Sequence, residues 1–215
     1  MSDFSTIAPY GTHFYRPVKQ VGDDLESYAN LLRKWQSVQN LVSRETLGQM
    51  WPRHFVDSLQ ALALTTPDDR LFLDFGSGGG FPALPMAIAS KGSSRRFVLI
   101  EPTARKVSFL RTVTRELDLN VTVIGRRSDQ IDSRETGIPD VITSRALAAL
   151  PQLCQWMEPF LGPKTRAVLH KGREHVEELT ESGADWLYDV LVKPSDTDAS
   201  GVILTITNLR RKSAS

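Results

Sequence analysis

The sequence lacks most of the features that mark metal, redox, secreted or membrane proteins. Its 215 residues include one cysteine, Cys154, which excludes an internal disulfide and a cysteine-based metal site. The four histidines show no spacing typical of zinc ligands, and we predict no metal site. A signal peptide and an apolar run of about 20 residues are also missing. We therefore expect a soluble, cytoplasmic protein that does not contact a membrane.

An excess of charge of one sign is missing as well. The formal net charge is +1, so overall electrostatics give no argument for nucleic-acid binding. The local balance differs, because the stretch from Lys91 to Arg127 holds nine basic residues and three acidic ones. This stretch is expected either to present a basic face to phosphate groups or to be an ordinary solvated helix face.

The N-terminal part of the chain is predicted to be helical. Residues 1–22 are polar and contain prolines and glycines, which predicts an irregular, loosely attached tail. Apolar residues then recur three and four positions apart, which predicts an amphipathic helix from Asp23 to about Ser37. Pro52 suits the first turn of a later helix. We assign residues 23–66 to an N-terminal helical subdomain.

From Arg70 the pattern changes to alternating strands and helices. This alternation predicts an α/β fold in which helices cover both faces of a mainly parallel sheet. The loop over residues 196–201 reads as a hairpin connection, so the last two strands are expected to be antiparallel. The seven predicted strands cover residues 71–75, 97–100, 121–124, 141–143, 167–169, 186–192 and 202–207.

The most informative stretch runs from Leu71 to Pro82. A short apolar run ends at Asp74 and is followed by glycines at 76, 78 and 80 and then by a helical pattern. A dinucleotide fingerprint would need glycine at 81, where Phe81 stands. The motif D-x-G-x-G-x-G instead resembles the cofactor loop of S-adenosylmethionine (SAM) methyltransferases. A glycine-rich turn without a ligand is the alternative. The residues expected to contact SAM here are Asp74, Gly76, Ser77, Gly78 and Gly80.

Two further strand ends carry candidate cofactor contacts. Glu101 ends the second strand, where a doubly wound sheet places a carboxylate that accepts from ribose hydroxyls. An exposed ion pair with Arg105 is the alternative for Glu101. Ser128 and Asp129 follow the third strand and are expected beside the adenine ring. They are equally suited to cap the next helix.

The fourth and fifth strands end in basic residues. Arg145 is expected where cofactor and substrate meet, because open α/β sheets bind ligands at the carboxyl ends of their strands. A salt bridge is the alternative for Arg145, and Lys171 is given a functional or a structural role with equal weight. His54 and Asp57 lie three residues apart, on one helix face. We expect them to lock the N-terminal helices to the core rather than to catalyse.

Taken in order, these segments resemble the bacterial small-subunit ribosomal RNA guanine-N7 methyltransferases, also called the glucose-inhibited division protein B family. The glycine after the family's Phe-Pro-type pair is Ala83 here, and the family's usual Asp-Ser is Glu101-Pro102. The resemblance extends from about Tyr28 to Lys171. It rests on Asn40-Leu41, Arg53-His-Phe-Val-Asp-Ser-Leu59, Asp74-Phe-Gly-Ser-Gly-Gly-Gly-Phe-Pro82, Arg105-Lys-Val-Ser-Phe-Leu110, Ser144-Arg-Ala146 and Lys171-Gly172.

The resemblance implies a monomeric SAM-dependent enzyme that methylates N7 of one guanine in 16S ribosomal RNA of the small subunit. Residues 67–215 would then be the SAM-dependent methyltransferase domain. Phe81 and Arg145 are implied as cofactor contacts, in addition to the positions already given. Arg145 and Lys171 are implied to support catalysis. RNA contacts are expected at Arg105, Lys106, Arg127 and Lys171.

Three rival interpretations are compatible with parts of the sequence. A SAM-dependent methyltransferase acting on another RNA, a protein or a small molecule would share the glycine loop and Glu101. A nicotinamide oxidoreductase would need the glycine that is missing at position 81, and a non-enzymatic RNA-binding module would bind RNA but not SAM. Guanine N7 has a free lone pair and carries no proton, so the absence of a catalytic dyad in the sequence fits methylation at N7.

Overall fold

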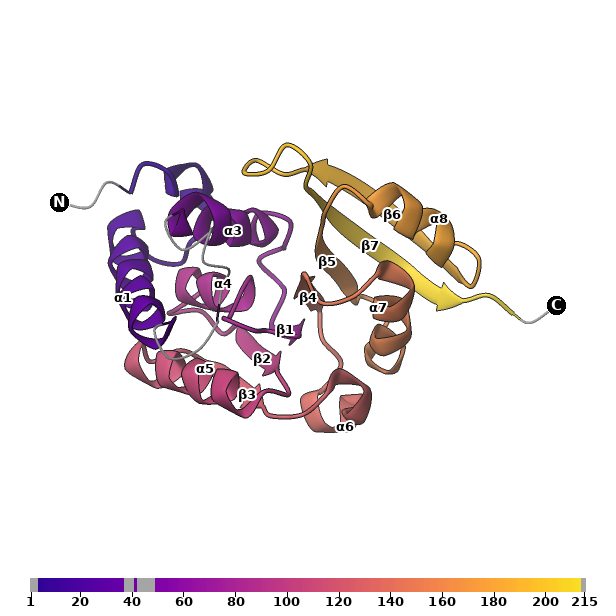
Figure 1. Ribbon diagram of the computed structural model, residues 1–215, viewed down its shortest axis with the longest axis horizontal. Helices are drawn as coiled ribbons and strands as arrows, with labels where there is room; N and C mark the ends of the chain where they lie inside the picture. Colours follow the sequence, from indigo (N-terminus) through magenta and orange to yellow (C-terminus); the bar gives the residue numbers. More distant parts are fainter. Residues whose placement is uncertain (1–3, 37–40, 42–48, 214–215) are drawn as a thin grey trace.

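The structure is a computed structural model that describes residues 4–36, 41 and 49–213. A seven-stranded sheet runs through the molecule, with helices packed around it (Figure 1). Asn40, which forms part of the family resemblance with Leu41, lies outside the described residues. The strands are β1 (Leu71–Phe75), β2 (Arg96–Ile100), β3 (Val121–Ile124), β4 (Val141–Arg145), β5 (Arg166–Lys171), β6 (Trp186–Pro194) and β7 (Val202–Arg211).

The strand order confirms the predicted mainly parallel sheet with a terminal antiparallel hairpin. The order across the sheet is β3-β2-β1-β4-β5-β7-β6. The strands β1 to β5 pair in parallel, whereas β7 runs antiparallel to β5 and β6 runs antiparallel to β7. The order reverses at β1 and β4, and this reversal opens a crevice at the carboxyl ends of the two strands.

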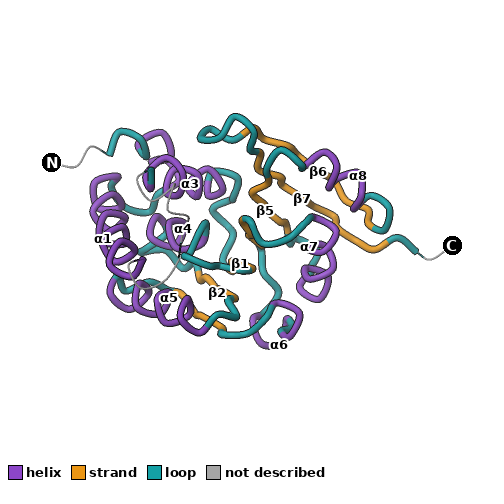
Figure 2. Tube along the Cα trace, viewed as in Figure 1, coloured by secondary structure: helices purple, strands orange, loops and turns teal. Residues whose placement is uncertain are grey.

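Helices cover both faces of the sheet (Figure 2), because the side chains on both faces of the central strands are mostly apolar and must be buried. Successive side chains of β1 point to opposite faces: Phe72 belongs to one hydrophobic cluster, and Leu73 and Phe75 belong to the other. The first cluster includes α4 and α5, and the second includes α7. The helices of this part are α4 (Ala83–Ala89), α5 (Ala104–Glu116), α6 (Ser133–Thr136), α7 (Leu150–Met157) and α8 (His175–Ser182).

The N-terminal helices belong to the first cluster. They comprise α1 (Val18–Gln36) and a π-helical segment, Trp51–Val56, that continues into α3 (Asp57–Leu62). The same cluster holds side chains from these helices, from α4 and from the sheet. The π-helical segment and α3 therefore lie against the sheet, close to the ends of β4 and β5. How the chain divides into domains stays a prediction.

The first helix starts earlier than predicted. It begins at Val18 rather than at Asp23, because Pro17 stands at its N-terminus, where the missing N–H costs nothing. Val21 and Gly22 are buried, and the Phe4 ring packs where a Gly22 side chain would be. A 3₁₀ helix covers Ala8–His13. Part of the predicted irregular tail is therefore packed against the core, through Ile7, Tyr10 and Val21.

Candidate active site

The loop after β1 takes a backbone path that requires glycine. Gly76, Gly78 and Gly80 have φ of +66°, +55° and +98°, in the region that L side chains rarely adopt. A Cβ on Gly76 would lie 2.4 Å from the Leu147 side chain, and one on Gly80 would collide with Leu84 and the Tyr28 hydroxyl. A Cβ on Gly78 would meet nothing closer than 3.7 Å. The loop is therefore tightly packed at Gly76 and Gly80 and open at Gly78.

Asp74 lies beneath this loop with an unusual charge state. Its side chain is 1% exposed, and one oxygen accepts a 2.6 Å hydrogen bond from Thr143 Oγ1. The other oxygen, Oδ2, is buried and has no hydrogen-bond partner. Burial raises the pKa of Asp74 to about 7, although the nearby Ser77 and Thr143 hydroxyls oppose the shift. A cation near Oδ2 would favour the ionised carboxylate.

Glu101, at the end of β2, shapes the same loop. Its side chain is 3% exposed, and its two oxygens accept hydrogen bonds of 2.9 Å from the backbone N–H groups of Gly78 and Thr103. Each carboxylate oxygen can accept a second hydrogen bond, so these contacts leave acceptor capacity for a ligand. The predicted ribose contact of Glu101 stays a prediction.

Phe81 is held in an aromatic cluster. It is 4% exposed, and its ring centroid lies 4.7 Å from that of His54. The Arg145 guanidinium lies over the face of the Phe81 ring, 4.9 Å from its centroid. Tyr28 and Phe55 complete the cluster. The side chain therefore supports Arg145 and the glycine loop from below. A contact between Phe81 and a cofactor stays a prediction.

Arg145 is fixed at the end of β4 by the N-terminal helices. Its guanidinium donates to the Asp57 carboxylate at 2.9 Å, to His54 Nδ1 at 2.8 Å and to the backbone oxygen of Arg53 at 3.1 Å. The salt bridge considered from the sequence is therefore present. Burial lowers the pKa of His54 to about 3, and the neighbouring Arg145 charge adds to this shift. The ring is therefore neutral at neutral pH and accepts a hydrogen bond from Arg145.

Asp57 joins four parts of the fold. Beyond Arg145, its carboxylate accepts from Thr197 Oγ1 at 3.0 Å and from Gln60 Nε2 at 3.2 Å. Its backbone oxygen accepts a 2.8 Å hydrogen bond from His170 Nε2. Asp57 thus connects α3 to β4, to β5 and to the loop between β6 and β7. His54 and Asp57 both contact Arg145, and in this way the N-terminal helices are attached to the sheet.

Lys171, at the end of β5, is buried and ion-paired. Its side chain is 6% exposed, and its ammonium donates to Glu178 Oε2 at 2.5 Å and to the backbone oxygen of Ala148 at 2.7 Å. Glu178 Oε2 also accepts from the Leu150 N–H at 2.7 Å. The pair anchors the segment after β4 that carries Leu147 onto Gly76. The predicted catalytic and phosphate-binding roles of Lys171 remain predictions, and a phosphate would have to approach an ammonium that is already paired.

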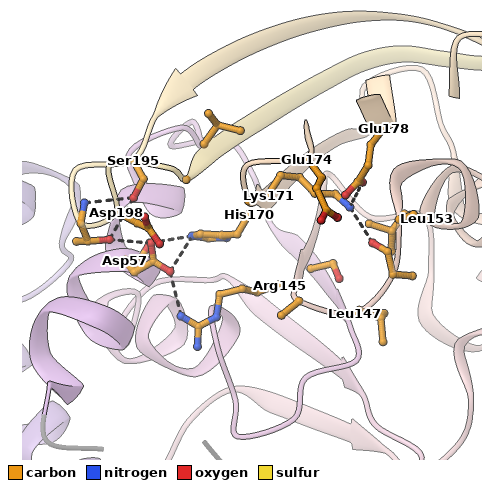
Figure 3. Close-up of a pocket in the computed structure, with 18 of the residues that line it drawn as sticks. Asp57, Arg145, Leu147, Leu153, His170, Lys171, Glu174, Glu178, Ser195 and Asp198 are labelled. Carbon is orange, nitrogen blue, oxygen red and sulfur yellow. Dashed lines mark hydrogen bonds and ion pairs between the residues drawn. The ribbon is translucent and has the colours of Figure 1, made fainter. Parts of the chain in front are cut away.

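His54, Asp57, Arg145 and Lys171 line one cavity of about 620 Å³, shown in Figure 3. It lies between the ends of β4 and β5, α8 and the loop between β6 and β7, whose Ser195, Thr197 and Asp198 belong to the wall. The cations in the wall are paired with acids at 2.5 to 3.1 Å, in the ion pairs Arg53–Asp198, Arg145–Asp57 and Lys171–Glu178. Within each pair the acid neutralises the charge of the cation. The cavity therefore suits an uncharged polar ring better than a phosphate group.

Apart from Arg145 and Lys171, the predicted site residues lie outside the lining of this cavity, including Asp74, the glycine loop, Phe81 and Glu101. Ser128 and Asp129 belong to a 3₁₀ turn (Ser128–Gln130) after β3, and Asp129 forms an exposed ion pair with Arg127 at 3.1 Å. Arg105 and Lys106 lie in the first turn of α5. Their predicted contacts with adenine and RNA stay predictions.

The basic stretch from 91 to 127 does not form a single exposed face. Arg95 is 4% exposed, lies against the rings of Tyr15 and Phe72, and donates to the backbone oxygen of Thr66. It is a core residue, and its place could not be read from charge alone.

Several wall residues were missed as site residues, among them His170, Glu178 and Thr197. His170 directly precedes Lys171, and Glu178 lies seven residues after Lys171 on a helix with few apolar residues. No sequence motif at either position indicates a functional site. The contacts of Thr197 join residues 140 positions apart in the chain. Among the described residues, no group of three or more His, Cys, Asp or Glu side chains could hold a metal ion. In the same part of the chain, no helix is long and apolar enough to cross a membrane.

Comparison with solved structures identifies the class of fold. A SAM-dependent methyltransferase from Aquifex aeolicus matches with a TM-score of 0.55 at 16% identity, over 74% of this chain and 93% of that one. The fold is therefore that of SAM-dependent methyltransferases.

Comparison of sequences identifies the family. The model of the GidB family, described as rRNA small subunit methyltransferase G, matches residues 22–199. The ribosomal RNA small subunit methyltransferase G of Cereibacter sphaeroides is 42% identical over 184 residues, which cover 85% of this chain and 87% of the relative. The protein of that name from Methylorubrum populi is 40% identical over 90% of this chain and 91% of its own length. The chain belongs to this family.

Proposed function

We propose that this protein transfers a methyl group from SAM to N7 of one guanine in 16S ribosomal RNA of the small ribosomal subunit. The observation that carries the proposal is the family match over residues 22–199, which spans both the glycine loop and the cavity. The position of the cavity at the ends of β4 and β5 agrees with a substrate that meets a cofactor bound over β1.

The residues at the glycine loop fit SAM. The loop backbone is open at Gly78, where an added Cβ would meet nothing closer than 3.7 Å. Asp74 Oδ2 is a buried acceptor without a partner, and a cationic ligand would compensate it. Asp74, the loop from Gly76 to Phe81 and Glu101 would hold the cofactor, with Ser128 and Asp129 on the adenine side. When bound, SAM supplies an electrophilic methyl group attached to a sulfonium sulfur.

The side chains of the cavity suit a nucleophile that needs no base. Guanine N7 carries a lone pair and no proton, so methylation requires alignment of the ring more than proton transfer. His54, the ring nearest to Arg145, has its pKa lowered to about 3, and Asp57 is held in an ion pair. We assign Arg145 and Lys171 to positioning: they hold the walls between which the purine ring is aligned with the methyl donor.

RNA phosphates would be bound outside the cavity. Arg105, Lys106 and Arg127 lie around the ends of β2 and β3 and are the candidates for backbone contacts, which position RNA without reading its sequence. A base must leave its stack to enter the cavity, as single-stranded loops allow. We further expect the enzyme to act as a monomer, and in the cytoplasm because its substrate is found there.

The proposal is tested by titrating the protein with SAM and with NAD, and then by incubating it with tritiated SAM and small ribosomal subunits that lack the modification. We expect binding of SAM, no binding of NAD, and label on 16S ribosomal RNA. Label on ribosomal protein, or binding of SAM without any transfer to the subunit, would show that the substrate is wrong. Binding of NAD alone would overturn the cofactor assignment.

A further inference from the structure

One carboxylate of the cavity wall is both fixed and only partly used. Glu178 Oε2 accepts from Lys171 Nζ at 2.5 Å and from the Leu150 N–H at 2.7 Å. Its other oxygen, Oε1, makes no hydrogen bond in the described structure and is not among the buried polar atoms that lack a partner. Oε1 is therefore an accessible acceptor whose direction is set by two anchors on the same carboxylate.

The position of Glu178 defines which group of a substrate base could donate a hydrogen bond to this acceptor. Lys171 ends β5, which is separated from β1 by β4 alone, so the end of β5 lies two strand spacings, about 10 Å, from the end of β1, where the glycine loop begins. A purine bridges such a span when one edge faces the methyl donor and the opposite edge faces Glu178. In guanine the edge opposite N7 carries the 2-amino group, a hydrogen-bond donor that adenine and hypoxanthine lack.

We propose that Glu178 Oε1 accepts a hydrogen bond from the 2-amino group of the target guanine, which makes Glu178 a specificity-determining residue. This inference rests on the proposed function. An anchored carboxylate loses little side-chain entropy when the base binds, and its charge is already compensated by Lys171. Glu174 also lines the cavity, but it is exposed and has no anchor in the described structure (Figure 3). It therefore offers a matched control.

Glu178→Gln tests the acceptor directly. Lys171 and the Leu150 N–H are both donors, so they hold the amide oxygen at the Oε2 position and leave the amide NH₂ at the Oε1 position. The variant therefore replaces the free acceptor by a donor, which opposes the 2-amino group. A role confined to positioning Lys171 would slow methylation of every substrate by the same factor.

The experiment compares reconstituted small subunits that carry guanine or inosine at the methylated position. The wild-type enzyme should favour guanine in kcat/KM by roughly 10- to 100-fold, the effect of one hydrogen bond to a charged group. Glu178→Gln should reduce this preference to within about threefold, while Glu174→Gln should keep it. Unchanged SAM affinity of the two variants shows that both are folded.

Each outcome bears on one claim. A wild-type preference near one, or a Glu178→Gln variant that keeps the wild-type preference while both substrates react more slowly, overturns the inference. Loss of the preference in Glu174→Gln but not in Glu178→Gln also overturns it and assigns the reading to Glu174. Failure of the wild-type enzyme to methylate the guanine-containing subunit is a failure of the proposed function instead.

Discussion

Replacement of Asp74 by Asn should stabilise the free protein and weaken SAM binding. Burial raises the pKa of Asp74 from 3.8 to about 7, a difference of about 3 pH units. At about 1.4 kcal/mol per pH unit, ionising this carboxyl in the folded protein costs roughly 4 kcal/mol. Asn keeps an oxygen that accepts from Thr143 Oγ1 and has no charge to bury. The variant therefore removes most of that cost.

The pH dependence gives the sign of the effect. The folded pKa lies above the unfolded one, so the folded state binds more protons between pH 4 and 7. The stabilisation from protonated Asp74 is complete below about pH 4 and is lost as the pH rises through about 7. Wild-type stability should therefore fall over this range relative to that of Asp74→Asn, and the two curves should run parallel above about pH 8.

Urea unfolding of both proteins without SAM, from pH 4 to 8, measures this difference. Calorimetric titration with SAM measures how SAM affinity depends on the ionisation of Asp74, because a cationic ligand favours the ionised carboxylate. Wild-type affinity for SAM should rise between pH 6 and 8, and that of Asp74→Asn should be lower and independent of pH. Identical pH slopes of stability in the two proteins, or unchanged SAM affinity in the variant, would refute the reasoning.

Three further substitutions test the site. Gly76→Ala should reduce SAM affinity at least tenfold, because its Cβ would press on Leu147, whereas Gly92→Ala, whose Cβ would meet nothing within 4 Å, should cost about 1 kcal/mol of stability and leave SAM binding unchanged. Asp57→Asn should lower the free energy of unfolding by about 3 kcal/mol, because it removes the carboxylate that balances the charge of the half-buried Arg145; unchanged urea midpoints would contradict this. Arg145→Ala should reduce methyl transfer at least 100-fold while far-UV circular dichroism stays native, and full activity would remove Arg145 from the site.

The sequence predicted the sheet and the glycine loop because both leave local patterns. Apolar runs and turn residues alternate along the chain, and the glycines at 76, 78 and 80 correspond to three positive φ angles. The hairpin was also readable from the residues of its loop. The start of α1 was not, because Pro17 reads as a loop residue unless the packing of Val21 against the core is known.

The contacts that build the cavity wall were beyond the sequence. Gln60 accepts from the Asp196 N–H at 2.7 Å and Asp57 accepts from Thr197, which brings the hairpin loop onto α3 across more than 130 residues. No local pattern encodes such a contact. Nothing in the sequence pairs Lys171 with Glu178, and only the packing of α8 beside α7 buries their ion pair.

The central claim, methylation of one guanine at N7 in 16S ribosomal RNA, is tested most directly by mapping the transferred label. Small subunits that lack the modification are incubated with the enzyme and tritiated SAM, and the RNA is digested, sequenced at the labelled site and hydrolysed to free bases. We expect all label in 7-methylguanine from a single position. Label in another base, at another atom of guanine, or nowhere in the RNA would contradict the account.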